Sequence, residues 1–345
     1  MARLVIDGAE DRSFQRWPTT GGTVTVVVAA APWTPGYKFR TSGAAAFFRK
    51  QISVAGLAEL YGALKYQRNY SDESPTVCYF LDSAGTTILQ LLIQGPGGTA
   101  NQLSVYRGAK DAGGTLLGTD AVDTFDTSTM HLVEFYYQPL NSGGQITVKV
   151  DGTSRISYGG GILDTTAGLE NISTVGFGWV SGSHLSGYDS QGDYDDIVLD
   201  SAAWIGNTAI GGLAITGAGA SAQWTPSAGD NYACVDEIPY NDTDYNNTNT
   251  TNNKDTYALA SFVTPTTEIK CIQASGRISY NGSPTPTKQE LILRCGGTDY
   301  SHATQITPSS IFSCVDRIWE EDPDDPGNPF TPATMPTEMG VMAVA

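Results

Sequence analysis

The stretch HLVEFYYQPLNSGGQITVKVDGTSRISY, residues 131–158, decides the fold class. Ile146, Val148 and Val150 alternate with polar residues, which places the three apolar side chains on one face of a strand. The segments NSGG and DG that separate the apolar runs contain residues that tolerate positive φ, as tight turns require. The stretch therefore predicts a meander of three antiparallel strands.

Strand patterns continue upstream of this meander. Residues 76–93 predict a hairpin closed by residues 82–85, and residues 102–106 predict one more short strand. In residues 57–66, LAELYGALKY, the apolar residues have helical spacing. We nevertheless expect a strand there, because the flanking elements are β and Gly62 would weaken a helix interior by about 1 kcal/mol relative to Ala.

The length and composition indicate an all-β chain of two β-sandwich domains. The chain has 345 residues, with 39 Gly and only 16% charged residues, which favours short strands joined by turns. After residue 200 the sequence becomes rich in Gly and Ala, so we predict domains at 1–205 and 206–345, the second being smaller. The strands expected in the second domain are residues 268–280, 288–295 and 310–319.

Two polar segments and the cysteines complete the second domain. Residues 241–255, rich in Asn and Thr, predict a long exposed loop, and the acidic, Pro-rich residues 320–332 break any strand they enter. Cys271 and Cys295 lie in alternating patterns and are expected to be small core residues. The alternative is that the four cysteines of this domain form two disulfides, with a pairing that the sequence does not determine; they are Cys234, Cys271, Cys295 and Cys314.

The negative net charge of the chain limits the kinds of molecule that it can bind. A net charge of -17 would repel nucleic acid and anionic membranes. The longest apolar run, residues 24–33, is shorter than the roughly 20 residues that a membrane-spanning helix needs. The opening MARLVIDGAEDRSF lacks the apolar core of a secretory signal. We therefore expect no nucleic acid, no membrane insertion and no signal peptide, with synthesis in the cytoplasm of the cell that makes the protein.

Three segments together resemble the concanavalin A-like jelly rolls of the laminin-G and MAM type. They are IDGAE at residues 6–10, the run that ends in VKVDG at residue 152, and GDYDDIVLDS at residues 192–201. The resemblance covers about residues 1–205 and implies that the first domain is a jelly-roll sandwich. Ala9 departs from the pattern, because an aromatic residue is common at this position.

The second half has a different resemblance. The segments WIGNTAI, QWTPSAGDNYACVDEIPYNDTDY and the closing TEMGVMAVA are similar to the C-terminal half of a group of tailed-bacteriophage virion proteins, in the same order. The Asn/Thr-rich insertion departs from that pattern. The resemblance implies a virion protein on the particle surface, in a tail, a fibre or a capsid decoration, that contacts other virion proteins. Particle symmetry would then make it a homo-oligomer.

The most specific candidate site is acidic. Asp7 and Glu10 lie at the start of the first expected strand, and Asp193, Asp195 and Asp196 lie in the last. In jelly rolls of this kind the first and last strands are neighbours, so these carboxylates could meet around a hard cation such as Ca²⁺. The MAM resemblance implies a cation at Asp7, Glu10 and Asp195 or Asp196. The alternative is that Asp195 and Asp196 cap backbone amides and face water.

No enzyme signature is present in the sequence. The acids do not form the alternating Glu-x-Asp-x-x-Glu pattern of jelly-roll glucanases, and no GxSxG nucleophile elbow occurs. His131 begins an alternating strand and is expected to be a structural histidine. The sequence therefore predicts a protein that is not an enzyme and that has no catalytic or cofactor-binding residues.

Tyrosines offer a binding alternative. Tyr188, Tyr240 and Tyr245 lie among Asp, Asn and Ser residues that could bond sugar hydroxyls, while the tyrosine rings could stack on sugar rings. The sequence hypothesis is thus a structural phage protein that acts through protein contacts and glycan adhesion. The alternatives are a lectin-like carbohydrate-binding module of a bacterial surface protein and a glycan depolymerase.

Overall fold

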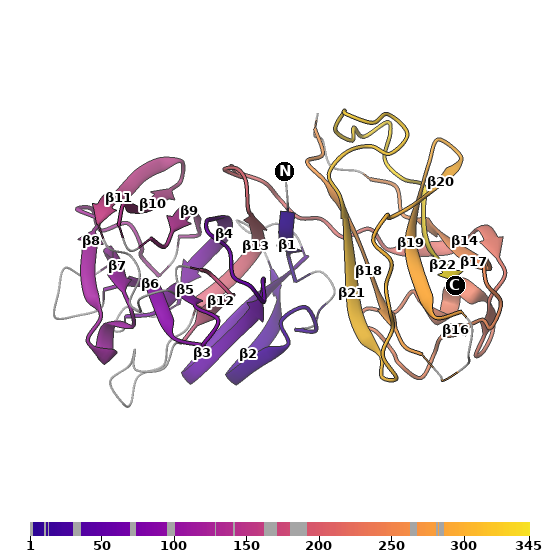
Figure 1. The fold of residues 1–345 in the computed structure, drawn as a ribbon, viewed down its shortest axis with the longest axis horizontal. Helices are drawn as coiled ribbons and strands as arrows, with labels where there is room; N and C mark the ends of the chain where they lie inside the picture. Colours follow the sequence, from indigo (N-terminus) through magenta and orange to yellow (C-terminus); the bar gives the residue numbers. More distant parts are fainter. Residues whose placement is uncertain are drawn as a thin grey trace. The chain divides into compact units, whose positions relative to one another are not determined.

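The chain forms two compact units, residues 1–211 and 212–345, in a computed structural model. The sequence placed the division near residue 205. The regular structure is almost entirely antiparallel strand (Figure 1), and no helix in the described part of the chain is long and apolar enough to cross a bilayer. The structure describes residues 3–9, 12, 14–29, 36–69, 74–94, 101–127, 129–140, 142–161, 171–179, 192–262, 268–280, 282 and 286–345.

The first unit is one continuous antiparallel ladder that folds over on itself. Its strands are β1 (Arg3–Asp7), β2 (Thr19–Ala29), β3 (Gly36–Gln51), β4 (Leu60–Arg68), β5 (Thr76–Leu81), β6 (Thr87–Ile93), β7 (Leu103–Arg107), β8 (Thr115–Thr119), β9 (His131–Gln138), β10 (Gly144–Val150), β11 (Thr153–Gly161), β12 (Thr174–Gly178) and β13 (Gly192–Asp200), with a 3-10 turn η1 (Lys110–Ala112). The order across the ladder is β11-β10-β9-β4-β13-β3-β12-β5-β6-β7-β8, with β1 on β13 and β2 on β3.

Strand β3 belongs to both layers of this sandwich. Its first part pairs with β13 and its last part pairs with β12, on either side of Ala45, which has a φ of 62°. Buried side chains of β4, β9 and β13 pack in one cluster with those of β5, β6 and β12. The ladder therefore encloses a core between two layers, which confirms the predicted β-sandwich of jelly-roll type.

Aromatic rings fill the end of this core. The Trp17 ring meets Phe48 and Phe177 edge-on at 5.1 and 5.3 Å, and Phe48 lies 5.4 Å from Tyr194. All four side chains are buried. Such edge-to-face pairs stabilise a core beyond the area that they bury.

The meander that decided the fold class is confirmed. β9, β10 and β11 pair as antiparallel neighbours, and Ile146, Val148 and Val150 are fully buried. The turn before β11 places Asp151 and Gly152 at φ values of 52° and 76°, as a tight hairpin requires. The predicted hairpin of β5 and β6 and the short strand β7 are also present.

The segment with helical spacing forms strand β4, as expected. Gly62 lies in this strand opposite Phe135. A Cβ at residue 62 would stand 2.1 Å from the Phe135 ring. Glycine is therefore present here because a core ring lies across the strand, and the leucine spacing reflects burial in the sandwich.

The second unit is a smaller sandwich. Its elements are β14 (Ile215–Ala222), β15 (Thr225–Pro226), η2 (Asn231–Cys234), β16 (Asn246–Asn247), β17 (Lys254–Leu259), β18 (Ile272–Ile278), β19 (Lys288–Cys295), β20 (Thr298–Ser301), β21 (Ser313–Trp319) and β22 (Glu338–Val344). A sheet of order β14-β17-β22-β19-β20 packs through a shared core on the pair β18-β21, and β15 pairs with β16. β18, β19 and β21 match the three strands predicted from the sequence.

The cysteine predictions are confirmed in part. Cys295 is buried in the core of the second unit. Cys271 is only half-buried and precedes β18, so its place in a strand was wrong. The thiols of Cys234 and Cys295 are free in the structure. The two-disulfide alternative needs both of these residues, so it is not formed here.

The polar tract predicted as a long exposed loop is more ordered than its composition indicates. Asn246 and Asn247 form β16, which pairs with β15, and Asp255 at its end is fully buried. The expected strand break at residues 320–332 is confirmed, since no strand forms there. Phe330 of this segment is buried in the core.

Candidate functional site

The predicted acidic site lies where the first and last strands of the first unit pair. β1 runs antiparallel to β13, with Asp7 opposite Ile197, which confirms the expected neighbourhood of the two strands. Gly8 lies beside Asp195. Glu10 lies outside the described residues.

The carboxylate of Asp7 accepts hydrogen bonds from residues of the first unit. The donors are the Trp17 indole at 2.8 Å, the Ala9 backbone at 3.0 Å and Arg16 at 3.4 Å. Asp7 is fully buried. The residue thereby anchors the core tryptophan, because a buried carboxylate needs donors of this kind.

Asp195 and Asp196 cap backbone amides, as the alternative interpretation predicted. Asp195 accepts a hydrogen bond from the Asp196 amide at 2.8 Å, and Asp196 accepts one from the Ile210 amide at 2.8 Å. Lys65 on β4 pairs with the other Asp196 oxygen at 2.5 Å. The two side chains do not face water as that interpretation held, because both are buried.

These contacts place N–H groups on the oxygens that a cation would need. Within the described residues, no three acidic, His or Cys side chains are grouped closely enough to hold a metal ion. Ca²⁺ prefers six to eight oxygen ligands. The calcium site stays a prediction, and its test is the melting temperature with Ca²⁺ and with a chelator.

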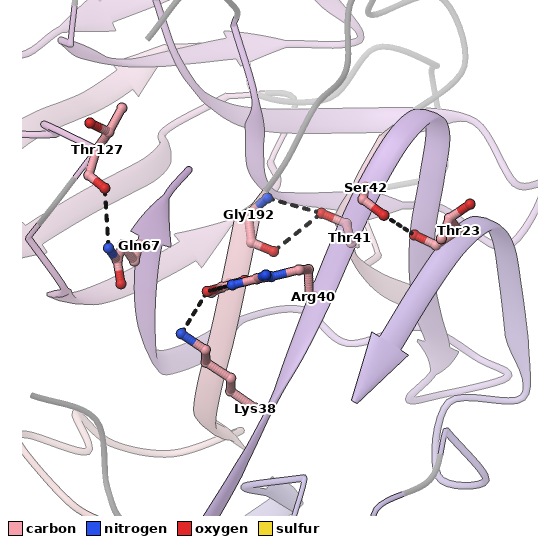
Figure 2. Close-up of polar contacts among 9 residues, drawn as sticks. Thr23, Lys38, Arg40, Thr41, Ser42, Gln67, Thr127 and Gly192 are labelled. Atoms are coloured by element: carbon pink, nitrogen blue, oxygen red, sulfur yellow. Dashed lines mark hydrogen bonds and ion pairs between the residues drawn. The ribbon is translucent and has the colours of Figure 1, made fainter. Parts of the chain in front are cut away.

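Asp193 belongs to an ion triad on the outer side of β13. Arg40 donates two hydrogen bonds to its carboxylate at 2.7 and 2.8 Å, and Lys38 approaches it at 2.6 Å. Figure 2 shows Lys38 and Arg40 side by side on β3 next to Gly192, which bonds the Thr41 hydroxyl at 3.2 Å. Burial alone would raise the pKa of Asp193, but the hydrogen bonds and charges of Arg40 and Lys38 lower it. The triad is thus charge-compensated and joins β3 to β13.

His131 contacts a turn residue and a core ring, while its buried Nε2 has no hydrogen-bond partner within the described part of the chain. Its Nδ1 lies 2.7 Å from the Asp151 carboxylate, and its ring packs edge-on against Phe125 at 5.0 Å. The side chain is buried. It therefore fixes the turn between β10 and β11.

A cavity of about 520 Å³ in the second unit is a stronger candidate for a functional site. Its lining comes from β17, β19 and β22 of the larger sheet, from β18 of the smaller pair, and from residues 234–248. The volume falls within the range of about 300–1,000 Å³ that is typical of small-ligand sites. Its aromatic and polar lining residues include Glu237, Tyr240, Asn241, Asp242, Asp244, Tyr245, Asn247, Tyr257, Arg277, Ser279, Tyr280 and Phe312.

Two of the three tyrosines singled out from the sequence line this cavity. Tyr240 and Tyr245 both contribute to the wall, and Tyr188 lies outside the described residues. The Tyr245 side chain is 42% exposed, and its ring lies 6.1 Å from that of Phe312. A ring that is partly exposed at a cavity wall can pack against the flat face of a ligand.

A network of hydrogen bonds holds the Asn-rich segment, residues 241–255, in place. The Asn246 amide donates to the Tyr257 hydroxyl at 2.9 Å and to the Asn231 carbonyl at 2.7 Å. Tyr257 donates to Asp255 at 3.3 Å. Asp255 also accepts hydrogen bonds from the Gln223 and Trp224 amides at 2.6 and 2.8 Å. This network orders the part of the cavity wall that residues 241–255 form, although their composition predicts an exposed loop.

Arg277 joins β18 to the same wall. Its Nε donates to Asp242 at 2.5 Å, its terminal nitrogen donates to the other Asp242 oxygen, and it also reaches the Phe312 carbonyl at 3.2 Å. The hydrogen bonds of Asp242 raise the pKa of the Arg277 guanidinium, against the lowering effect of burial. A bidentate ion pair is therefore part of the cavity lining.

Glu237 and Asp244 both line the cavity, and each affects the pKa of the other. Burial raises the pKa of Glu237, and the charges of Asp244 and Asp236 raise it further. Hydrogen bonds from Cys234 and then from Ser227, whose hydroxyl lies 2.8 Å from Asp244, lower the pKa of Asp244.

Sequence reasoning missed Glu237 and Arg277. Glu237 stands in no recognisable catalytic or binding motif, and Arg277 lies within the expected strand of residues 268–280. No local pattern marks Arg277, because its partner Asp242 is brought to it by tertiary packing.

Known proteins provide only distant comparisons. No protein-family model and no curated protein sequence matches the chain. Among solved structures, alginate lyase Aly36B is similar at 14% identity over 58% of this chain and 94% of that chain, with a TM-score of 0.41. Domain 4 of AbnA, a GH43 extracellular arabinanase from Geobacillus stearothermophilus, in complex with arabinotriose, has 11% identity over 58% and 95% of the chains and a TM-score of 0.37.

A third similar structure is the carbohydrate-binding module CBM66 from Bacillus subtilis. It has 8% identity over 53% of this chain and 94% of that chain, with a TM-score of 0.33. At these TM-scores the likeness carries no argument about what this chain binds.

Proposed function

We propose that the protein is a glycan-binding protein whose ligand occupies the cavity of the second unit. The observation that carries the proposal is the wall itself, which combines tyrosine rings with a dense set of side-chain hydroxyl, amide and carboxyl groups around about 520 Å³. Saccharides present apolar ring faces and a rim of hydroxyls. A wall of this composition offers a surface for each of them.

The polar groups match a ligand that both donates and accepts hydrogen bonds. Asn241, Asn247 and Ser279 each carry donor and acceptor capacity, while Asp244 and Glu237 add acceptors. A purely apolar ligand would remove water from these groups without satisfying their remaining hydrogen-bond capacity, which costs free energy. The lining thus favours a hydroxyl-rich molecule.

The non-enzymatic role expected from the sequence is part of this proposal.

The place of the protein on a phage particle is a separate proposal. It rests on the order of sequence segments after residue 204, and with it go the expected virion partners and the homo-oligomer. Immunogold labelling of intact particles tests it. Labelled tails or capsids would support it, and unlabelled particles would contradict it.

The glycan proposal is tested with the full chain on a glycan array, followed by calorimetric titration of the best glycan. We expect selective binding that Tyr245→Ala weakens about tenfold, equivalent to about 1.4 kcal/mol. The matched control is Tyr232→Ala, in the same unit but outside the lining. Absence of binding across the array, or an equal loss in both variants, would refute the assignment.

A further inference from the structure

The charge of the cavity narrows the class of glycan. Arg277 is the single basic residue among the described lining residues, and it is already paired with Asp242. Glu237 and Asp244 have no Lys or Arg partner within the described part of the chain. The cavity therefore holds uncompensated negative charge in a protein whose net charge is -17.

The sequence neighbours and the described contacts of Asp244 bring it no positive charge, and Asp244 is part of the cavity lining. Ser227 donates to one Asp244 oxygen at 2.8 Å, and the Tyr245 amide in turn donates to the Ser227 hydroxyl at 3.0 Å. These contacts fix the carboxylate without neutralising it. Asp244 also lies next in sequence to Tyr245, whose partly exposed ring lines the same wall.

Carboxylates next to aromatic rings form the environment in which proteins bind organic cations. The negative face of an aromatic ring attracts an ammonium group, and a neighbouring carboxylate adds a charge-assisted hydrogen bond. An acidic sugar in the same place would meet like charge. It could pair with Arg277 only by breaking the ion pair between Arg277 and Asp242.

We propose that the preferred ligand is an amino sugar, a saccharide whose free protonated amine binds between Glu237, Asp244 and the tyrosine wall. This inference deepens the proposed function and rests on it. The amine is the recognised group, while the sugar hydroxyls contact the amide-rich part of the lining. N-acetylation removes the charge, and a uronic acid reverses it.

The experiment uses the full chain at constant pH and physiological salt. A panel presents each hexose in its 2-amino, 2-acetamido and uronic acid forms, and affinities are measured by calorimetry. We expect the amino form to bind at least tenfold more tightly than the acetamido form, and the uronic acid to bind more weakly still. Equal or tighter binding of the acetamido form would overturn the inference while leaving glycan binding intact. If no member binds, the proposed function itself fails.

Variants separate a specific amine site from general attraction to an acidic protein. Asp244→Asn, and Glu237→Gln as a second and milder change, should reduce the preference for the amino form to less than threefold. Asp236→Asn is the matched control, because Asp236 is exposed, neighbours Glu237 and does not line the cavity. An equal loss of preference in Asp236→Asn would overturn the inference, since it would show that net charge alone attracts the amine.

Discussion

The guanidinium of Arg277 on β18 is held by the carboxylate of Asp242, a residue 35 positions earlier in the chain, and both side chains line the cavity of the second unit. The pair joins the segment of residues 237–248 to β18. The Tyr245 ring lies 6.1 Å from the Phe312 ring and makes a second contact from the same segment. We therefore expect ligand binding to depend on how these contacts position residues 237–248.

Arg277→Ala should weaken glycan binding by about tenfold while changing the free energy of unfolding by only about 1 kcal/mol. The pair is partly exposed, with Asp242 at 43%, and such ion pairs contribute little to stability. Its effect on binding comes from positioning the wall. Calorimetry and urea unfolding measure the two quantities. Lys270→Ala, which breaks the exposed pair with Glu268, is the control and should change neither.

Asp255→Ala should destabilise the protein by about 3 kcal/mol. The substitution leaves the Gln223 and Trp224 amides and the Asn231 side chain without their buried acceptor, and each unsatisfied buried donor costs about 1–3 kcal/mol. Urea unfolding measures the loss. Asp230→Ala removes an exposed acid of the same unit and should stay within about 0.5 kcal/mol. Similar values for the two variants would contradict the structural role of Asp255.

Gly62→Ala should destabilise the first unit by about 1–3 kcal/mol, because the added methyl group must displace the Phe135 ring. Gly159→Ala on β11 is the matched control, since its Cβ would meet only the Gln145 side chain at an ordinary 3.8 Å. Thermal unfolding compares the two. A melting temperature that falls equally in both variants would show that strand glycines matter here for another reason.

Asp193→Asn should change how stability depends on pH. The folded-state pKa of Asp193 is below its ordinary value of 3.8, so its contribution is present above that pH and is lost as the pH falls through the folded-state pKa. The variant should be less stable than the wild type at pH 7, by about 3 kcal/mol, because Lys38 loses its buried partner. The difference should narrow below about pH 4. A difference that stays constant down to pH 2 would contradict the ion triad.

Local patterns were sufficient to predict most of the fold. The alternation at Ile146, Val148 and Val150 and the Asp151-Gly152 turn specify a hairpin within a few residues, and the structure contains it. Gly62 shows where the local pattern was ambiguous, because the spacing around it is also typical of a helix. The reason for a glycine in this strand is the ring of Phe135, which lies opposite on β9 and is distant in sequence.

The sites were harder to predict because their residues meet through tertiary packing. Asp195 and Asp196 were expected either to hold a cation or to cap backbone amides and face water. They do cap amides, including that of Ile210 after β13, but both carboxylates are buried. Tyr240 and Tyr245 were recognised by residue type alone. Arg277 and Tyr257 could not be grouped with them, since each comes from a different strand and only the packed sandwich joins these strands around one cavity.

The most direct test of the central claim is hydrogen–deuterium exchange of the full chain with and without its best-binding glycan. The account predicts slower exchange on binding in residues 237–248 of the cavity wall and in β18 around Arg277, with the first unit unchanged. Protection confined to residues 1–211, with no change around the cavity, would contradict it.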